Sequence, residues 1–215
     1  MKSHFEVLKK ILDERIIAIV RLDSAEYFLE VAQALKAGGV SVVEFTLTTP
    51  GALDMLKNVS ARFGDEMLIG AGTVLDPETA RTAILSGGEF IVTPTFNPAT
   101  IEMCKHYGKP IVAGAMTPTE MLNSWQAGAD LIKVFPVGNI GGVDYIKSVL
   151  APLRQLRLVP TGGVNADNAA SYLKAGAAVV AVGGGLVDKN SVKRGDWNLI
   201  TDEARRLVKA VKSCS

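Results

Sequence analysis

The chain has 215 residues, 48% of them hydrophobic, which is enough for one well-buried domain spanning residues 1–215. Its 23 basic and 22 acidic residues leave a formal charge of +1 without basic clusters, which argues against nucleic acid or an anionic membrane as a partner. No apolar run reaches the ~18 residues of a membrane span. We therefore expect a cytoplasmic protein that binds a small molecule or a second copy of the chain.

The residues available for redox and metal chemistry are few. Cys104 and Cys214 lie far apart, which suits a reducing compartment, although a single bridge between them stays an alternative. The only histidines, His4 and His106, form no metal-binding pair. We expect no metal and no cofactor, so the chemistry should come from lysine, carboxylate, hydroxyl and backbone groups.

Regular alternation of two kinds of segment runs through the chain after an amphipathic helix expected within residues 1–15. Glycines 38, 87, 128 and 176 each follow an amphipathic stretch and precede an apolar run, which is typical of a helix end before a strand. Their spacing of 41 to 49 residues is twice one βα unit, so a further strand is expected between each pair. The expected strands are 16–21, 42–46, 67–73, 90–93, 110–114, 131–135, 157–160 and 179–182. The expected helices are 25–37, 50–63, 77–86, 99–107, 118–126, 143–150, 166–174 and 201–212.

This alternation predicts an α/β fold with parallel strands covered by helices. Eight repeats favour a closed (β/α)8 TIM barrel with an extra N-terminal helix over an open sheet. In such a barrel the active site is built at the carboxyl ends of the strands.

Lys133 lies within an otherwise apolar run, residues 131–136, and is the only one of fourteen lysines placed in the middle of a predicted strand. Such a lysine is either solvated on an open sheet face or enclosed in a barrel. Enclosure removes solvation from the ammonium and favours the neutral amine, which is a nucleophile.

Further polar residues fall late in the other predicted strands. Alternation places Arg21 with Ile17 and Ile19, Glu44 with Thr46, and Thr73 with Ile69 and Ala71. Each of these polar residues also has a structural interpretation. Glu44 and Lys133 could form a buried ion pair, Arg21 could cap a strand end or pair with Asp23, and Thr73 could be a strand former. Their occurrence at one rim favours a site.

Glycines follow the last two strands, at Gly162 and Gly163 and again at Gly183 and Gly184. Backbone N–H groups exposed there could hold an oxyanion, and the loops after strands 7 and 8 of such barrels often bind phosphate. The alternative is that these glycines only form tight turns.

These segments together resemble the class I aldolases of the 2-keto-3-deoxy-6-phosphogluconate (KDPG) and 4-hydroxy-2-oxoglutarate (KHG) aldolase family. The resemblance rests on Arg21 and on residues 44–46, 70–74, 93–94, 133–136, 141–142, 160–164 and 183–184. It implies that Lys133 forms a Schiff base, that Glu44 is the acid/base residue, and that the protein is a homotrimer. It also implies a pyruvate end lined by Thr73, Pro94, Phe135 and Thr161.

Two positions depart from the pattern of many KDPG-cleaving members. Thr48 stands where they carry an arginine, so Arg21 is expected to supply the cation for the substrate carboxylate. Gly185 stands where they carry a serine, which leaves phosphate binding to backbone groups or indicates an unphosphorylated substrate.

The expected activity is cleavage of a 2-keto-3-deoxy sugar acid to pyruvate and an aldehyde. An imine on Lys133 would serve as the electron sink, and Glu44 would shuttle protons, directly or through a water held by Thr73. Two alternatives remain. One is a phosphosugar isomerase or epimerase on the same barrel, with Glu44 as base and no imine. The other is a non-catalytic trimeric binding module.

Overall fold

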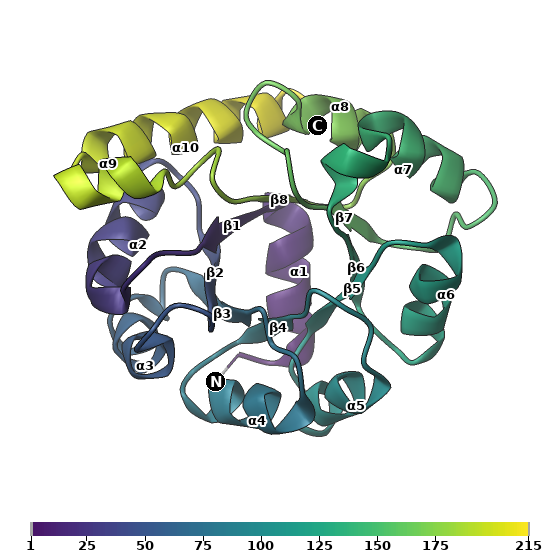
Figure 1. Cartoon of the computed structure of the whole chain (residues 1–215), viewed down its shortest axis with the longest axis horizontal. Coiled ribbons are helices and arrows are strands. Elements are labelled where there is room, and N and C mark those ends of the chain that lie inside the picture. The colour runs from purple at the N-terminus through teal and green to yellow at the C-terminus, as the bar shows by residue number, and fades with distance from the viewer. Residues whose placement is uncertain (1, 215) are drawn as a thin grey trace.

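Eight parallel strands form one sheet in the computed structural model, which describes residues 2–214 (Figure 1). Hydrogen-bonded neighbours follow the order β7-β6-β5-β4-β3-β2-β1-β8. Between β7 and β8 a bridge joins Thr161 to Ala181, and the Ala178 N–H donates to the Leu158 carbonyl at 2.9 Å. The sheet therefore forms the (β/α)8 TIM barrel that the sequence predicted. The strands are β1 (Ile16–Val20), β2 (Val42–Thr46), β3 (Leu68–Gly72), β4 (Phe90–Val92), β5 (Ile111–Ala115), β6 (Leu131–Val134), β7 (Leu158–Pro160) and β8 (Val180–Val182).

Helices surround the strands as a ring (Figure 1). Proline starts α4, α5 and α6, where the missing N–H costs no hydrogen bond. The helix predicted for residues 25–37 begins as the short 3-10 helix η1 (Ala25–Tyr27) and continues as α2, whereas α9 and the 3-10 helix η2 (Val137–Ile140) were not predicted. The helices are α1 (His4–Glu14), α2 (Phe28–Ala37), α3 (Ala52–Phe63), α4 (Pro77–Leu85), α5 (Pro98–His106), α6 (Pro118–Gln126), α7 (Gly142–Leu150), α8 (Ala169–Lys174), α9 (Lys189–Arg194) and α10 (Trp197–Lys212).

Helix α1 closes the amino-terminal end of the barrel. Ser3 and Glu6 form a capping box that starts the helix. Val7 and Ile11, both fully buried, then pack into the cluster of side chains that fills the barrel interior. Figure 1 accordingly shows α1 through the middle of the ring of strands. No helix among residues 2–214 has both the length and the apolar character that a membrane crossing requires.

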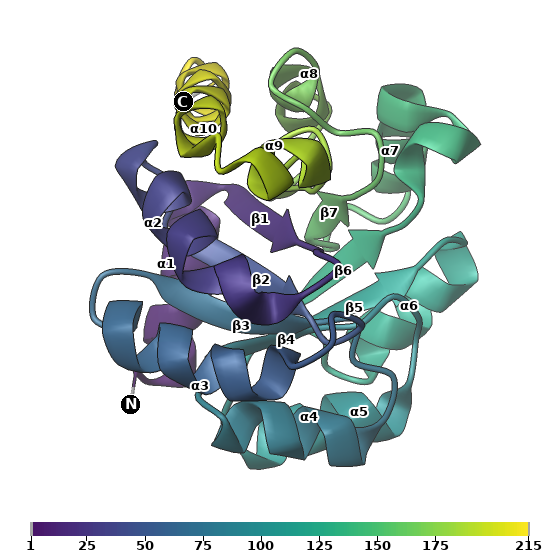
Figure 2. The ribbon, with the colours of Figure 1, turned by 60° about the vertical axis from the view of Figure 1, so that its left-hand side comes forward.

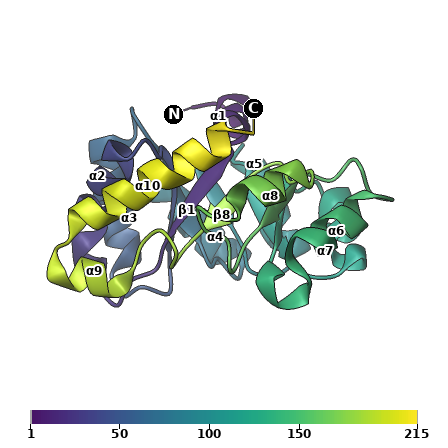
Figure 3. The same ribbon diagram turned by 90° about the horizontal axis from the view of Figure 1, so that it is seen from above.

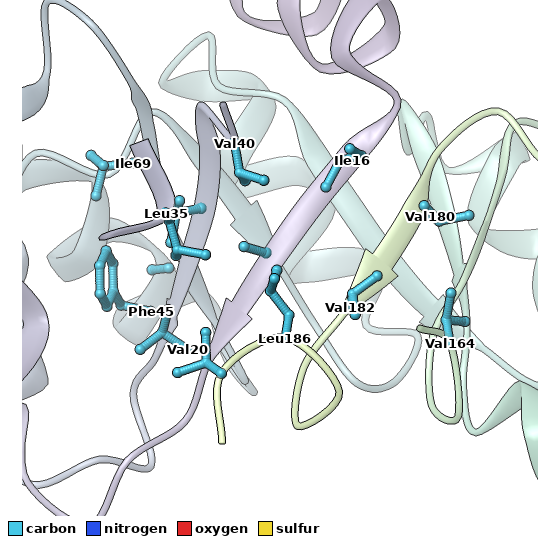
Figure 4. Packing of buried hydrophobic residues seen from close by; sticks show 14 of the residues in the cluster. Ile16, Val20, Leu35, Val40, Phe45, Ile69, Val164, Val180, Val182 and Leu186 are labelled. Carbon is cyan, nitrogen blue, oxygen red and sulfur yellow. The ribbon is translucent and has the colours of Figure 1, made fainter. Parts of the chain in front are cut away.

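Two apolar layers lie on the two faces of the strands. Side chains such as Ile16, Val20 and Phe45 face the helices, and Figure 4 shows them packed with Leu35 of α2. Alternate residues, including Ile17 and the fully buried Phe90, fill the barrel interior. This period-2 pattern is what a parallel sheet covered by helices requires.

Strand β3 corrects one prediction. Ile69 and Ala71 pack in the outer layer against the helices, whereas Leu68 belongs to the interior cluster. The face on which the sequence analysis grouped Thr73 is therefore the outer face of β3. The error arose because both faces of this strand are buried, so its composition does not tell inside from outside.

The last two helices complete the ring beside the strand ends that carry the site. Helix α9 lies near the carboxyl ends of the strands (Figure 2), and α10 runs on from it along α2 and α8 (Figure 3). Asp23, just after β1, forms ion pairs with Lys189 at 2.6 Å and with Lys193 at 2.8 Å. These contacts tie α9 to the β1 loop.

Both cysteines are free thiols, so the bridge that the sequence left open is not formed. Cys104, on the buried face of α5, is fully buried, and burial raises the pKa of its thiol to about 12. A thiol in that state is a poor nucleophile.

Candidate active site

A cavity of about 810 Å³ opens at the carboxyl ends of the strands. Its lining includes Ile19 on β1 and residues from the loops after β6, β7 and β8, as the barrel architecture predicts for an active site. Eight of the twelve candidate residues border it: Arg21, Lys133, Phe135, Thr161, Gly162, Gly163, Gly183 and Gly184.

Lys133 enters the cavity from β6. It shares the inward-facing alternation of Leu131, and its register partners are Gly114 on β5 and Val159 on β7. The residue is 4% exposed, and its Nζ lies 5.4 Å from the centroid of the Phe135 ring. The lysine is thus enclosed in the barrel and not solvated on an open sheet.

Glu44 faces Lys133 from β2 and is 1% exposed. One carboxylate oxygen lies 3.8 Å from the Lys133 Nζ, so the buried ion pair that the sequence offered as an alternative is formed, but at a separation beyond hydrogen-bond distance. Within residues 2–214 neither carboxylate oxygen has a hydrogen-bond partner. Burial raises the pKa of Glu44, while the nearby charges of Lys133 and Arg21 oppose the shift only in part. An unpartnered carboxylate with a raised pKa is suited to accepting and returning a proton.

Arg21 follows β1, is exposed, and borders the same cavity. Among residues 2–214 no carboxylate lies within 4.0 Å of its guanidinium. The proposed structural partner, Asp23, instead holds Lys189 and Lys193, which lower the pKa of Asp23 to about 2. The pairing of Arg21 with Asp23 was therefore a wrong alternative, and the guanidinium is available to an anionic ligand.

The loops after β7 and β8 present their glycines to the cavity. Gly162 and Gly163 have φ of 93° and 81°, a left-handed conformation that side chains rarely adopt. Gly184 has ordinary φ, and a Cβ added there would meet nothing within 4 Å. Beside these loops, Thr161 is buried and its hydroxyl donates to the Val159 carbonyl at 3.2 Å.

Three predicted residues besides Glu44 lie outside the cavity lining. Thr46 is fully buried, with its hydroxyl 3.4 Å from that of Thr49 and 3.3 Å from that of Thr48. Thr73 follows β3 with a φ of 58°, which breaks the strand alternation, and is half-buried. Pro94, after β4, is half-buried too. The threonine cluster thus occupies the segment where many KDPG-cleaving members carry an arginine.

The structure adds residues at the outer end of the cavity that the sequence analysis missed. They come mostly from α9, and they are Asn165, Asp188, Lys189, Asn190 and Lys193. Asp188 caps α9 by accepting from the Ser191 N–H at 2.8 Å, and Gly195 ends the helix with φ of 70°. An N-cap aspartate and a C-terminal glycine seven residues later were signals that could have predicted this helix. No group of three or more metal-ligating side chains occurs in the described part of the chain.

A (β/α)8 barrel with an enclosed lysine and a facing unpartnered carboxylate is an architecture suited to imine chemistry. A model of the family described as "KDPG and KHG aldolase" matches residues 7–203. The chain therefore belongs to the KDPG and KHG aldolase family, and is an enzyme of the carbon–carbon lyase class.

Individual relatives agree with this assignment. The chain is 34% identical over 206 residues to a 2-dehydro-3-deoxy-phosphogluconate aldolase of Haemophilus influenzae, covering 96% of this chain and 95% of that protein. A solved native KDPGal structure is 30% identical, with a TM-score of 0.86 over 93% of this chain and 95% of that one. A KDPG aldolase of Legionella pneumophila, solved with pyruvate captured as a covalent carbinolamine, is 28% identical. Its TM-score is 0.86 over 93% of this chain and 97% of that one.

Proposed function

We propose that the enzyme is a class I aldolase that reversibly cleaves a 2-keto-3-deoxy sugar acid to pyruvate and an aldehyde through an imine on Lys133. One observation carries the proposal: an enclosed amine and an unpartnered, buried carboxylate face each other 3.8 Å apart in one cavity. The proposed substrates are 2-dehydro-3-deoxy-6-phosphogluconate and 4-hydroxy-2-oxoglutarate, the two compounds after which the family is named. The covalent carbinolamine of the Legionella relative supports the same first step.

Imine formation begins when the neutral amine of Lys133 attacks the C2 ketone of the substrate. The carbinolamine then loses water to give a protonated imine conjugated to C3. Arg21 borders the cavity without a carboxylate partner among residues 2–214, so we assign it to the substrate carboxylate. Phe135, whose ring lies 5.4 Å from the Lys133 nitrogen, covers the reacting carbons.

Carbon–carbon cleavage then needs a base and an electron sink. Glu44 accepts the proton of the C4 hydroxyl, the C3–C4 bond breaks, and its electrons pass into the imine to form an enamine. The C4 fragment leaves as an aldehyde. Glu44 returns the proton to C3, and water hydrolyses the imine to release pyruvate. A water held by Thr73 is a second route for the proton.

The outer cavity holds the distal end of the substrate. Gly162, Gly163, Gly183 and Gly184 supply backbone donors there. We assign three residues to the shape of the pyruvate end. Thr161 lies in the cavity lining there, and Thr46 and Pro94 lie outside the lining. Because Gly185 replaces the serine of many KDPG-cleaving members, no hydroxyl is present at this position to bind a phosphate. Binding of a phosphorylated substrate would then depend on these backbone groups.

The assembly we propose is the homotrimer that the family resemblance implies. Met116, shortly before α6, and Trp125, in its last turn, are each 44% exposed and offer apolar surface for a second copy. Sedimentation equilibrium should give three times the 22.8 kDa mass of one chain. A monomer mass would contradict this assembly.

Trapping with borohydride tests the reaction type. Pyruvate plus borohydride should add one substrate-sized mass to the protein, and peptide mapping should place it on Lys133 alone. An isomerase or epimerase that uses Glu44 as a base forms no imine and would stay unmodified. A panel of keto acids assayed for pyruvate release then identifies the substrate. A protein that releases pyruvate from none of them would be a binding module.

A further inference from the structure

Inward-facing positions of β3 and β5 carry glycine where a side chain would point into the barrel. Two of these glycines are explained by packing. A Cβ at Gly70 would lie 2.5 Å from the ring of Phe90, which fills the interior in front of it. A Cβ at Gly114 would lie 2.1 Å from the backbone carbonyl carbon of Pro94. In both cases the obstructing atoms belong to a packed ring or to the backbone, so these glycines serve the fold.

Gly72 differs from both, because its obstructing atoms belong to Glu44. A Cβ at Gly72 would lie 2.7 Å from the Glu44 Oε1 and 2.9 Å from its Cδ. The register of β2 and β3 sets this contact, since it pairs Glu44 with Gly70 and Thr46 with Gly72. The carboxylate therefore occupies the recess that the missing side chain of Gly72 leaves in the barrel wall.

Nothing else in the described structure fixes the carboxylate by a directed contact. Both of its oxygens lack a hydrogen-bond partner among residues 2–214, and Lys133 is 3.8 Å away. The shape of the wall is then what determines where this carboxylate stands. We propose that Gly72 is a positioning residue, whose recess keeps the carboxylate of Glu44 beyond hydrogen-bond distance of the Lys133 nitrogen.

This separation matters for the reaction proposed above, on which the inference rests. A methyl group at residue 72 would displace the carboxylate away from β3 and into the interior, where Lys133 supplies the nearest opposite charge. A closer, hydrogen-bonded ion pair would favour the protonated lysine and the ionised glutamate more strongly than the present separation does. The free amine would become scarcer and Glu44 a weaker base, so both imine formation and proton transfer would slow.

The substitution Gly72→Ala should fold, because the atoms that must move are the end of a flexible side chain. In this variant the borohydride trapping of pyruvate on Lys133 should slow by at least about tenfold at neutral pH. At saturating pyruvate, where Lys133 is already an imine, the low-pH fall (the acidic limb) in the rate of pyruvate methyl-proton exchange depends on Glu44, and it should move to lower pH in this variant. Gly70→Ala is the matched control on the same face of β3. It should lower the thermal stability, because its methyl group meets the Phe90 ring, and leave the acidic limb unchanged per folded molecule.

A double-mutant cycle that combines Gly72→Ala with Glu44→Gln tests whether Gly72 acts through the carboxylate. A neutral amide cannot form the ion pair, so adding Gly72→Ala to Glu44→Gln should slow trapping by less than about threefold. Equal slowing in both backgrounds would overturn the proposal, as would an acidic limb that does not move.

Thermal unfolding tests, independently of catalysis, whether the Glu44 side chain occupies the recess at Gly72. Removing the glutamate side chain empties the recess, so Gly72→Ala should lower the melting temperature of Glu44→Ala by less than that of the unmodified chain. If Gly72→Ala alone does not fold, the double variant should regain folding. A double variant that is equally destabilised would refute the recess. Failure of pyruvate to label the unmodified enzyme would instead refute the proposed function, and the unfolding comparison would still test the recess.

Discussion

Lys133 and Glu44 face each other across the barrel interior with 3.8 Å between nitrogen and oxygen, and no hydrogen bond joins them. The other buried lysine, Lys109, lies before β5 near the opposite end of the barrel, and its nitrogen contacts Glu89 at 2.6 Å. A hydrogen-bonded pair such as Lys109 and Glu89 compensates both charges, whereas the wider separation leaves the Glu44 carboxylate without a hydrogen-bond partner and free to exchange a proton. The two lysines should therefore respond in opposite ways to substitution.

Lys133→Met should abolish pyruvate trapping and turnover while leaving the folded barrel intact. Lys133→Arg should also be inactive, because a guanidinium does not form the imine. Lys109→Met should keep turnover per folded molecule and lower the stability by about 1–3 kcal/mol, because the partly exposed Glu89 loses its hydrogen-bonded partner. Urea unfolding and a pyruvate-release assay on the same preparations measure both effects. A Lys133→Met variant that still turned over would exclude the Schiff-base mechanism.

Glu44→Gln keeps the size of the side chain and removes its titratable proton. Turnover should fall by roughly 10²–10⁴-fold, the usual contribution of a positioned acid/base group. Pyruvate should still be trapped on Lys133, because imine formation uses the amine. Steady-state kinetics together with mass spectrometry of the trapped protein give the comparison. If turnover per folded molecule were retained, Glu44 would be only a structural partner of Lys133.

The same variant should be more stable than the unmodified enzyme at neutral and alkaline pH. Burial raises the pKa of Glu44 above its ordinary value of 4.5, so the folded state favours the protonated acid. Its stabilising contribution is complete below pH 4.5 and disappears as the pH rises through the folded-state pKa. Glutamine does not ionise, so its advantage in melting temperature should be seen at pH 8 and vanish near pH 4. A lower melting temperature than the unmodified enzyme at both pH values would show that the carboxylate stabilises the fold.

Gly184→Val tests the backbone donors with little effect on the fold. A side chain at this position meets open space and requires no unusual φ, unlike one at Gly163, where φ is 81°. It should block approach of a distal phosphate and raise the Michaelis constant for a phosphorylated substrate by roughly 10–100-fold, the loss of one or two charge-assisted hydrogen bonds. The constant for 4-hydroxy-2-oxoglutarate should change little. Equal losses on both substrates would assign the glycines to the fold and favour an unphosphorylated natural substrate.

Gly185→Ser should act in the opposite direction, because it restores the hydroxyl that many KDPG-cleaving members carry. The added Cβ would lie 3.2 Å from the Cβ of Asn165, so only a small adjustment is needed. One new hydrogen bond should lower the Michaelis constant for a phosphorylated substrate by about 2–10-fold. An unchanged constant, measured beside Gly185→Ala, would place the phosphate elsewhere.

The repeated glycines and apolar runs were sufficient to predict the barrel, because each βα unit begins and ends with its own local signals. Strand β2 and helix α6 have the predicted bounds. The inward direction of β3 could not be predicted, since a strand buried on both faces carries no polar side to orient it. Helix α9 was missed because six residues are too short for helical periodicity to show.

The candidate site also has features that the sequence predicted and features that it could not predict. Lys133 and the glycine loops stand out in the sequence by residue type, and the structure brings them into one cavity with Arg21. The 3.8 Å gap between Lys133 and Glu44 depends on the packing of β2 against β3, which no local pattern encodes. Nor could the sequence show that Asp23 would bind Lys189 and Lys193 in place of Arg21, because that contact joins segments 166 residues apart.

Helix α1 seals the amino-terminal end of the barrel with Val7 and Ile11, so molecules enter and leave through the opposite mouth. Gly184 is exposed at that mouth, whereas Lys133 is 4% exposed deep inside. A single opening imposes an ordered release of products. The aldehyde, which is nearer the mouth, must dissociate before the covalently held pyruvate. In the reverse direction pyruvate must load first. Pyruvate should then inhibit cleavage competitively with respect to the sugar acid, and the aldehyde should not.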